Sequence, residues 1–303
     1  MTDFSNITLS YSTPEGEQGH NLRFLGFPGG ERHVWISPGL LHDAEKYTID
    51  ARIYSSDGVM DLLMLNDALR RVVGDRAIIN LNLPYLPYAR QDRVTVAGEP
   101  LSLKVFASLI NGMGFDKVTV ADPHSSVGIA LLDRVQIETP DQSIEAILAL
   151  PQFAQGVALV APDAGAHKRV QDLASRLGVP VVLCVKVRDT ATGKLSKPQV
   201  LGDAGLIPAV PLLVVDDICD GGGTFVGLIQ MLSALTDQDI SLFTTHGLYT
   251  KGLEPLSSYH SLFTAYPRDQ NLWARCGNYW LVEVSEVALR QSSDSEQRIV
   301  ETA

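Results

Sequence analysis

The chain has 303 residues, of which 45% are hydrophobic and 19% charged, so it can bury a core and is not expected to be disordered. No stretch approaches the roughly 20 apolar residues that span a bilayer, and the N-terminus lacks a basic, apolar leader, so we expect no membrane association and no signal peptide. The formal net charge of −11 disfavours nucleic-acid binding, because an acidic surface repels a phosphate backbone.

The first half of the chain alternates short β-type runs with amphipathic helical runs. Asp57 is expected to cap a helix over residues 59–72, because apolar residues follow it at helical spacing. Pro100 is expected to begin a second helix, which ends near residues 112–114. The strands predicted in this half cover residues 77–83 and 117–121.

The second half of the chain repeats this plan. Continuous Val, Ile and Leu runs separated by helices predict a parallel sheet that is covered on both faces. We therefore predict an α/β protein of two doubly wound parallel-sheet domains, over 1–145 and 146–290, with a polar tail over 291–303. The predicted strands of this half are 157–161, 180–185, 211–215 and 239–245, and the predicted helices end at Leu177 and cover 225–235.

Three cysteines, Cys184, Cys219 and Cys276, show no CxxC spacing and cannot all pair. We expect reduced thiols in a cytoplasmic protein, because Cys184 and Cys219 lie in or beside apolar strand-like runs.

The strongest chemical signal is the segment VVDDICDGGGTF at residues 214–225. A buried strand is predicted to end in Asp216 and Asp217, a loop with three glycines follows, and a helix begins near Phe225. Glycines let backbone N–H groups face an anion, and a helix N-terminus adds more donors, so the loop suits a phosphate. The two carboxylates suit sugar hydroxyls or a metal ion. The alternative is an ordinary glycine-rich turn with a capping Asp.

This segment resembles the motif of the type I phosphoribosyltransferase fold that binds 5-phosphoribosyl 1-diphosphate (PRPP). Further segments narrow the resemblance to the ribose-phosphate diphosphokinases, or PRPP synthases, and together they cover residues 22–265. These segments are FPGGE (27–31), PYLPYARQDR (84–93) with EPLSLKVFASLI (99–110), VTVADPHSS (118–126), APDAG (161–165), KVR (186–188) and TTHGLYTKG (244–252).

The resemblance implies substrates, a metal ion and site residues. The substrates would be ATP and ribose 5-phosphate, the metal ion Mg²⁺, and the assembly a homo-oligomer, either a dimer or a hexamer. The implied ATP-binding residues are Phe27, Gly29, Gly30, Glu31, Arg90, Gln91, Asp92, Arg93 and His124. The implied ribose-5-phosphate residues are Asp216, Asp217, Asp220, Gly221, Gly222, Gly223 and Thr224. His124 and Asp163 would hold the metal, and Lys186 and Arg188 would be catalytic.

The residue types fit these roles, although each also has a plainer interpretation. Arg90 and Arg93 follow a stiff turn and suit a polyphosphate, or they form a solvated charge cluster. His124 at a strand end can be structural. Lys186 and Arg188 can close over a reacting phosphate, or they belong to a solvated basic turn.

The sequence departs from the family pattern in three places. Gly29 replaces the usual Asn or Asp before Gly-Glu, KVR replaces adjacent basic residues, and Gly221–Gly223 lack a usual Thr hydroxyl. Two alternatives therefore stay open: a PRPP-consuming phosphoribosyltransferase, and a non-catalytic regulatory subunit of the synthase type. The first has no need of the RQD and DPH segments, and the second typically loses its catalytic-loop residues.

Overall fold

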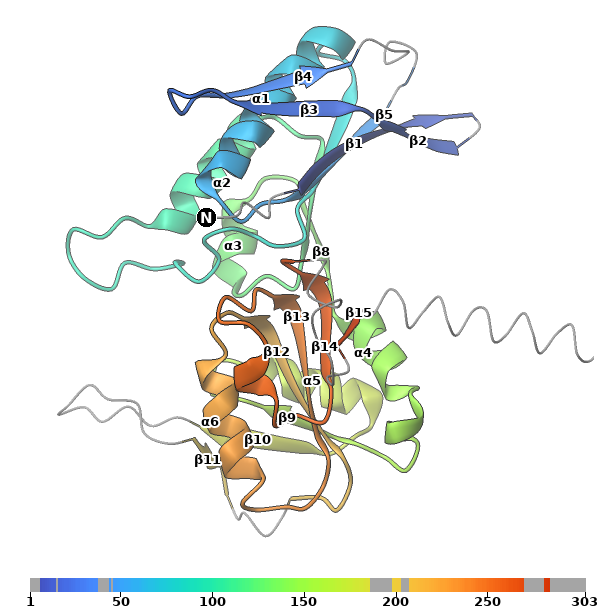
Figure 1. The fold of residues 1–303 in the computed structure, drawn as a ribbon, viewed down its shortest axis with the longest axis vertical. Helices are drawn as coiled ribbons and strands as arrows, with labels where there is room; N and C mark the ends of the chain where they lie inside the picture. Colours follow the sequence, from blue (N-terminus) through green and yellow to red (C-terminus); the bar gives the residue numbers. More distant parts are fainter. Residues whose placement is uncertain are drawn as a thin grey trace, which may run out of the picture. The chain divides into compact units, whose positions relative to one another are not determined.

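The computed structural model describes residues 6–14, 16–37, 44, 46–185, 198–202, 207–269 and 281–283. The chain forms two compact units, Met1–Thr139 and Pro140–Ala303, and each is built on its own large sheet (Figure 1). The boundary expected at residue 145 falls inside helix α4 (Asp141–Leu148), whereas the observed division leaves that helix whole in unit 2.

The large sheet of unit 1 has six strands in the order β2-β1-β5-β6-β7-β8. Strands β5 to β8 are parallel neighbours, whereas β1 pairs antiparallel with both β5 and β2. The strands are β1 (Asn6–Thr13), β2 (Gly16–His20), β5 (Lys46–Arg52), β6 (Ile78–Asn82), β7 (Lys117–Ala121) and β8 (Val135–Glu138).

Three helices, α1 (Ser56–Val73), α2 (Ser102–Gly112) and α3 (Ser126–Leu131), accompany this sheet and share one hydrophobic core with it. The cap of α1 is Ser55, so the expectation for Asp57 is wrong. Ser55 has an extended backbone, and its hydroxyl accepts a 3.0 Å hydrogen bond from the Gly58 N–H, which leaves Asp57 in the first helical turn.

A separate two-stranded hairpin, β3 (Leu22–Gly26) and β4 (Arg32–Ile36), packs on α1. Arg32 forms an ion pair with the buried Asp61 of α1, and its Nε–H donates to that carboxylate at 2.9 Å. The hairpin is therefore held against the helix by a partly buried charge pair as well as by packing.

The large sheet of unit 2 has seven strands in the order β11-β10-β9-β12-β13-β14-β15. All neighbours are parallel except β11, which pairs antiparallel with β10 at one edge. The strands are β9 (Ala158–Ala161), β10 (Val181–Val185), β11 (Gln199–Val200), β12 (Leu212–Cys219), β13 (Ile240–Gly247), β14 (Leu262–Pro267) and β15 (Leu281–Glu283).

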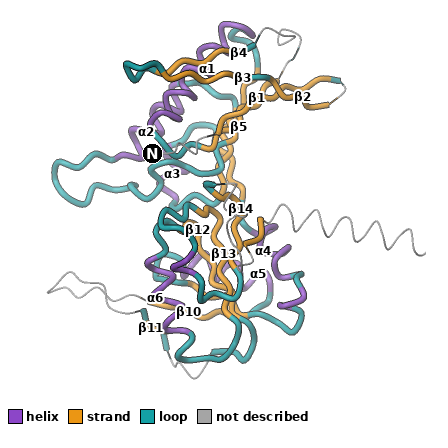
Figure 2. Tube along the Cα trace, in the orientation of Figure 1, coloured by secondary structure: helices purple, strands orange, loops and turns teal. Residues whose placement is uncertain are grey.

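Helices cover both faces of this sheet (Figures 1 and 2). One core cluster includes Phe225 and Leu228 of α6 (Gly223–Leu232), and the opposite cluster includes Ile144 of α4 and Val170 of α5 (His167–Leu177). Short 3₁₀ turns occur at η2 (Pro151–Phe153) and η4 (Glu254–Leu256). The predicted α/β class with parallel-dominated sheets is confirmed, whereas the antiparallel strands at the sheet edges were not predicted.

This topology decides where chemistry can occur. The carboxyl ends of β9, β12 and β13 are side by side in unit 2, and ligands of such sheets bind at these ends. Cys184 and Cys219 are buried free thiols, and burial raises the pKa of each to about 12, which makes them unreactive at neutral pH. Within the described parts of the chain, no helix has the length and apolar character to cross a membrane.

Candidate active site

The acid pair Asp216 and Asp217 lies inside β12, not at its end as predicted. Strand β12 continues to Cys219, with Asp216 opposite Thr244 of β13. Asp217 is buried, and its backbone N–H donates to Asp216 Oδ1 at 3.0 Å. Burial raises the pKa of Asp216 well above its usual range, and the charge of Asp217 raises it further.

Arg169 of α5 joins this acid pair, and the sequence did not single it out. Its Nη2 donates to Asp216 Oδ1 at 2.7 Å and lies 3.7 Å from Asp217 Oδ1. The guanidinium lowers the pKa of Asp216 and so opposes the effects of burial and of Asp217. Helix α5 follows β9, which is the neighbour of β12 in the sheet. The proximity of Arg169 to the acid pair therefore depends on the strand order, which the sequence alone does not give.

Asp163, which follows β9, lies close enough to the pair for its charge to raise the pKa of Asp216. Its Oδ1 accepts hydrogen bonds from the N–H groups of Gly165 at 3.0 Å and Ala166 at 3.3 Å. These bonds fix the carboxylate in the turn before α5. The structure thus brings Asp163 together with the acid pair.

The glycine loop connects β12 to α6. Gly222 has φ +73°, which an L side chain rarely adopts, and a Cβ there would lie in tight contact with Leu256 Cδ2, at 3.3 Å. Helix α6 begins at Gly223, earlier than predicted, so the N–H groups at the start of the helix lie within the loop itself. This geometry suits an anion.

The loop that follows β13 packs against the glycine loop. The Thr250 hydroxyl donates to Asp220 Oδ1 at 2.7 Å, and the Thr250 N–H donates to the Asp220 carbonyl at 3.1 Å. The N–H groups of Leu248 and Tyr249 both donate to the Cys219 carbonyl. The two loops are therefore fixed relative to each other.

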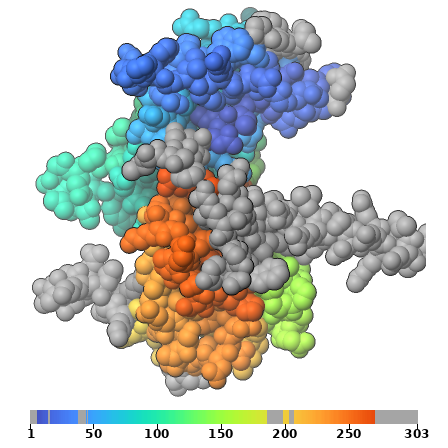
Figure 3. All heavy atoms as spheres, in the orientation of Figure 1, coloured from blue at the N-terminus to red at the C-terminus, as the bar shows by residue number. Residues whose placement is uncertain are grey.

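In unit 1 the RQDR segment presents three exposed side chains around one buried carboxylate. Arg90, Gln91 and Arg93 are exposed, whereas Asp92 is buried and accepts from Arg93 Nε at 2.8 Å and Nη2 at 3.3 Å. These bonds hold the pKa of Asp92 below its usual value. The chain beyond Arg93 projects from unit 1 as a loop that returns to α2 (Figures 1 and 3).

His124 lies near the RQDR segment, close enough for its charge also to lower the pKa of Asp92. The two segments meet where β6 and β7 end, and the Ala121 N–H donates to the Pro84 carbonyl at 3.0 Å. Asp122, just after β7, has the unusual φ of +38° and is buried. The structure therefore brings together Arg93, Asp92 and His124 within unit 1.

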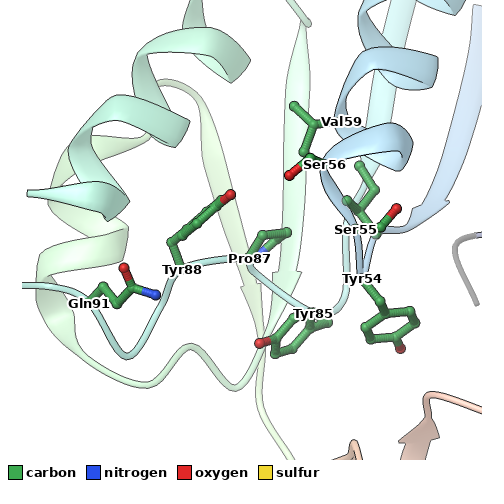
Figure 4. A pocket seen from close by; sticks show the side chains of 9 residues that line it. Tyr54, Ser55, Ser56, Val59, Tyr85, Pro87, Tyr88 and Gln91 are labelled. Carbon is green, nitrogen blue, oxygen red and sulfur yellow. The ribbon is translucent and has the colours of Figure 1, made fainter. Parts of the chain in front are cut away.

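A cavity of about 290 Å³ lies beside this region, between the start of α1 and the chain after β6. Tyr54 and Tyr85 are stacked there with ring centroids 5.4 Å apart, and Tyr88 and Gln91 line the other side (Figure 4). The side chains that line this cavity carry no formal charge. The lining residues are Ile53, Tyr54, Ser55, Ser56, Val59, Tyr85, Pro87, Tyr88 and Gln91.

FPGGE forms the turn of the β3–β4 hairpin. The Phe27 N–H donates to the Glu31 carbonyl at 2.9 Å, and Gly30 has φ +96°. A Cβ at Gly29 would lie 2.8 Å from the Glu31 carboxylate, so the missing side chain lets that carboxylate approach the backbone. Phe27 is half exposed at the tip. Lys186 and Arg188 lie outside the described residues.

Comparison with known proteins gives two family matches. Residues 27–114 match the N-terminal domain of ribose phosphate pyrophosphokinase, and residues 145–263 match the phosphoribosyl transferase domain. The fold is similar to that in the crystal structure of phosphoribosylpyrophosphate synthetase from Mycobacterium smegmatis, over 94% of this chain and 91% of that chain, with a TM-score of 0.70 at 22% identity. That likeness shows the fold.

Curated relatives carry the name ribose-phosphate pyrophosphokinase. The protein from Cereibacter sphaeroides is 31% identical over 206 residues, which are 64% of this chain and 57% of that protein. Two further relatives are matched over 61–62% of their length, so the chain spans less than two thirds of these three proteins. The Pyrococcus furiosus protein is 30% identical over 241 residues, 78% of this chain and 82% of that protein. The chain belongs to the ribose-phosphate pyrophosphokinase family.

Proposed function

We propose that this chain is a ribose-phosphate diphosphokinase that makes PRPP and AMP from ribose 5-phosphate and ATP. The observation that carries the proposal is the arrangement in unit 2, where an acid pair held by Arg169 precedes a glycine loop at the start of α6. Carboxylates accept hydroxyl hydrogen bonds and the loop offers N–H donors, so one sugar phosphate can satisfy both.

Ribose 5-phosphate would bind with its 5-phosphate on the backbone of residues 220–224 and with its 2- and 3-hydroxyls on Asp216 and Asp217. The carboxylates need to be ionised to accept two hydrogen bonds each, and Arg169 supports ionisation of Asp216. Asp217 is buried and Asp216 is held by hydrogen bonds from Arg169 and from the Asp217 N–H, which favours orientation of the sugar because little side-chain freedom is lost on binding.

ATP would bind in unit 1, with Arg90, Gln91, Arg93 and His124 as contacts. Asp92 has a different part in this proposal: it is buried and orients Arg93 rather than facing a nucleotide phosphate, which it would repel. The residues of the FPGGE turn, Phe27, Gly29, Gly30 and Glu31, remain proposed contacts of the adenine, and their backbone groups would have to replace the side chain that Gly29 lacks.

In the reaction, the oxygen of the sugar 1-hydroxyl would bond to the β-phosphorus of ATP, and the bond from that phosphorus to the α-phosphate oxygen would break. AMP leaves, and the hydroxyl proton is released. Such transfers depend mainly on alignment of the reactants and on neutralising charge at the phosphoryl oxygens. Lys186 and Arg188 are the side chains that we propose for this neutralisation.

The donors present fit Mg²⁺ carried by a nucleotide. Within the described residues no cluster of three or more His, Cys, Asp or Glu could hold a metal, and magnesium generally takes one or two protein ligands with phosphate and water oxygens. The backbone hydrogen bonds to Asp163 engage its Oδ1 atom, so its Oδ2 atom can face a metal ion. The His124 side chain is exposed. When bound, the ion would polarise the phosphoryl oxygens.

We also propose a homo-oligomer, as the family resemblance implies, and a cytoplasmic location, which the free thiols Cys184 and Cys219 support. AMP release that requires ribose 5-phosphate tests the activity, with Asp217→Asn as the variant expected to lose it. A base-exchange assay with adenine and PRPP addresses the PRPP-consuming alternative. No AMP release by the chain alone, together with a changed rate of AMP release by an active family member in its presence, would instead support the regulatory subunit.

A further inference from the structure

Lys251 is an exposed lysine in the loop after β13, and its side chain runs along the glycine loop. A Cβ added to Gly221 would lie 3.3 Å from Lys251 Cε, 3.4 Å from Cδ and 3.7 Å from Cγ. The space that a side chain at position 221 would fill is therefore occupied by the aliphatic part of Lys251. This contact extends the lysine along the backbone that would hold the sugar phosphate.

We propose that Lys251 is a further binding residue of this site and supplies the ammonium group for the 5-phosphate of ribose 5-phosphate. The inference rests on the proposed function. It adds to that function a side chain that favours the phosphorylated sugar over the free sugar. A lysine suits this role because its ammonium is a compact charge with three donors that can follow a tetrahedral anion.

The position of Lys251 is built into the fold. Thr250, its neighbour, donates to Asp220 through both its hydroxyl and its N–H. On the other side, the Gly252 N–H donates to the Tyr249 carbonyl at 2.9 Å, and Gly252 has φ +77°. Tyr249 is buried, so the segment before Lys251 is also held by packing.

The charge around the glycine loop favours such a cation. Asp163, Asp216 and Asp217 place negative charge near the sugar site, and Asp220 begins the loop itself. Arg169 is already engaged by the acid pair. Among the residues that the structure describes, Lys251 makes no ion pair, so its ammonium is available to an incoming anion.

The test is titration of the full-length protein with ribose 5-phosphate, and separately with inorganic phosphate, by isothermal calorimetry. Lys251→Met should weaken ribose 5-phosphate binding about ten- to hundredfold, the loss expected for one charge-assisted hydrogen bond. In turnover, KM for ribose 5-phosphate should rise while kcat and KM for ATP stay constant. Lys251→Arg should restore most of the affinity.

Lys117→Met is the matched control, because Lys117 is exposed and begins β7 at the opposite end of that strand from Asp122. A double-mutant cycle with Gly221→Ala adds an independent readout, since a Cβ at 221 presses on the Lys251 stem. Gly221→Ala should weaken phosphate binding more in the wild type than in Lys251→Met.

The outcomes separate the two proposals. Wild-type protein that binds ribose 5-phosphate, with unchanged affinity in Lys251→Met, would overturn the role of Lys251 and leave the proposed function intact. An equal rise in KM for ATP would also overturn it, because a contact to the sugar 5-phosphate alone should leave ATP binding unchanged. Wild-type protein that binds ribose 5-phosphate but makes no PRPP would contradict the proposed function and not the lysine.

Discussion

At the residue scale, Arg169 controls the ionisation of the acid pair. It is the cation that lowers the pKa of Asp216 against burial and the charge of Asp217. In the proposed function the ionised Asp216 carboxylate binds the sugar, so activity should appear as pH rises through the pKa of Asp216 in the folded protein. Arg169→Met should therefore move the acidic limb of kcat/KM for ribose 5-phosphate to higher pH, as measured by a pH–rate profile.

Arg176→Met is the control for this profile. Arg176 lies on the same helix and pairs with Asp141 instead, at 2.8 Å. Arg169→Lys keeps the charge and should leave the acidic limb near its original position. KM for ribose 5-phosphate should still rise, because a lysine ammonium lacks the planar set of donors that a guanidinium presents. An acidic limb that does not move in Arg169→Met would contradict the assignment.

Asp92 is expected to contribute to stability as well as to position Arg93. Its side chain is 3% exposed whereas that of Arg93 is 74% exposed, so solvent screens the ion pair on the side of the arginine. Asp92→Asn should lower the free energy of unfolding by about 1 kcal/mol and raise KM for ATP. Thermal melting and initial rates measure the two effects.

The pH dependence of this loss has a definite sign. Folding lowers the pKa of Asp92 below its usual 3.8, so its contribution is present above that value and is lost as pH falls through the folded pKa. The melting temperatures of wild type and Asp92→Asn should therefore converge below about pH 4. Asp67→Asn, which breaks an exposed pair with Arg71, should change the melting temperature much less at any pH. A difference that grows in acid would refute the account.

Lys186 is expected to act on the transferring phosphoryl group alone. Lys186→Ala should lower kcat on the order of 10²–10³-fold with little change in KM for either substrate, because the contact that we propose would form only in the transition state. Steady-state kinetics with both substrates varied measure this. Turnover close to that of the wild type would remove Lys186 from the mechanism.

At the element scale, the end of β13 depends on the absence of a side chain at Gly247. A Cβ there would overlap the ring of Tyr249 and lie 2.9 Å from Thr264 Oγ1. Both neighbours are buried, so neither can move away cheaply. Gly247→Ala should destabilise the protein by about 1–3 kcal/mol, measured by chemical unfolding, and should loosen the 248–252 loop.

Gly247→Ala should also be measured in the Tyr249→Leu variant, which lacks the aromatic ring. With the ring removed, Gly247→Ala should cost much less, giving a favourable coupling in the double-mutant cycle. Gly223→Ala is the stability control, since nothing lies within 4 Å of its Cβ position. Equal costs for Gly247→Ala in both backgrounds would show that the ring does not impose the glycine.

The regular elements of the fold were predictable because their sequence periodicity is strong. Continuous apolar runs gave β7, β9 and β10 within about one residue, and the amphipathic run gave the end of α5 at Leu177. Strand β12 was predicted too short, because two carboxylates ordinarily end a buried strand. Here Arg169 compensates their charge and lets the strand continue.

The remaining features depend on contacts between distant segments. Strands β1 and β2 are mostly polar, and their places in the sheet follow from long-range pairing, of β1 with β5 and of β2 with β1. Arg169 appears in the sequence as one charge on a helix face, and Asp92 appears as one more contact of ATP. The glycine loop was predictable as an anion site, but the overlying Lys251 was not, since no local pattern connects positions 221 and 251.

At the scale of the whole molecule, the combination of two family matches favours the synthase over a PRPP-consuming transferase. A PRPP-consuming transferase would account for the match over 145–263 but not for the match over 27–114. The chain carries a formal charge of −11 and yet is proposed to bind two polyanionic substrates. Local cations, Arg90 and Arg93 in unit 1 and Lys251 in unit 2, must therefore offset the overall repulsion.

The most direct test of this account is phosphorus NMR of the purified protein with ATP, ribose 5-phosphate and Mg²⁺. We expect equal amounts of AMP and a sugar-linked diphosphate to appear together, with no signal change when ribose 5-phosphate is omitted. AMP without the sugar diphosphate, or unchanged spectra from folded protein, would contradict diphosphate transfer to the 1-hydroxyl.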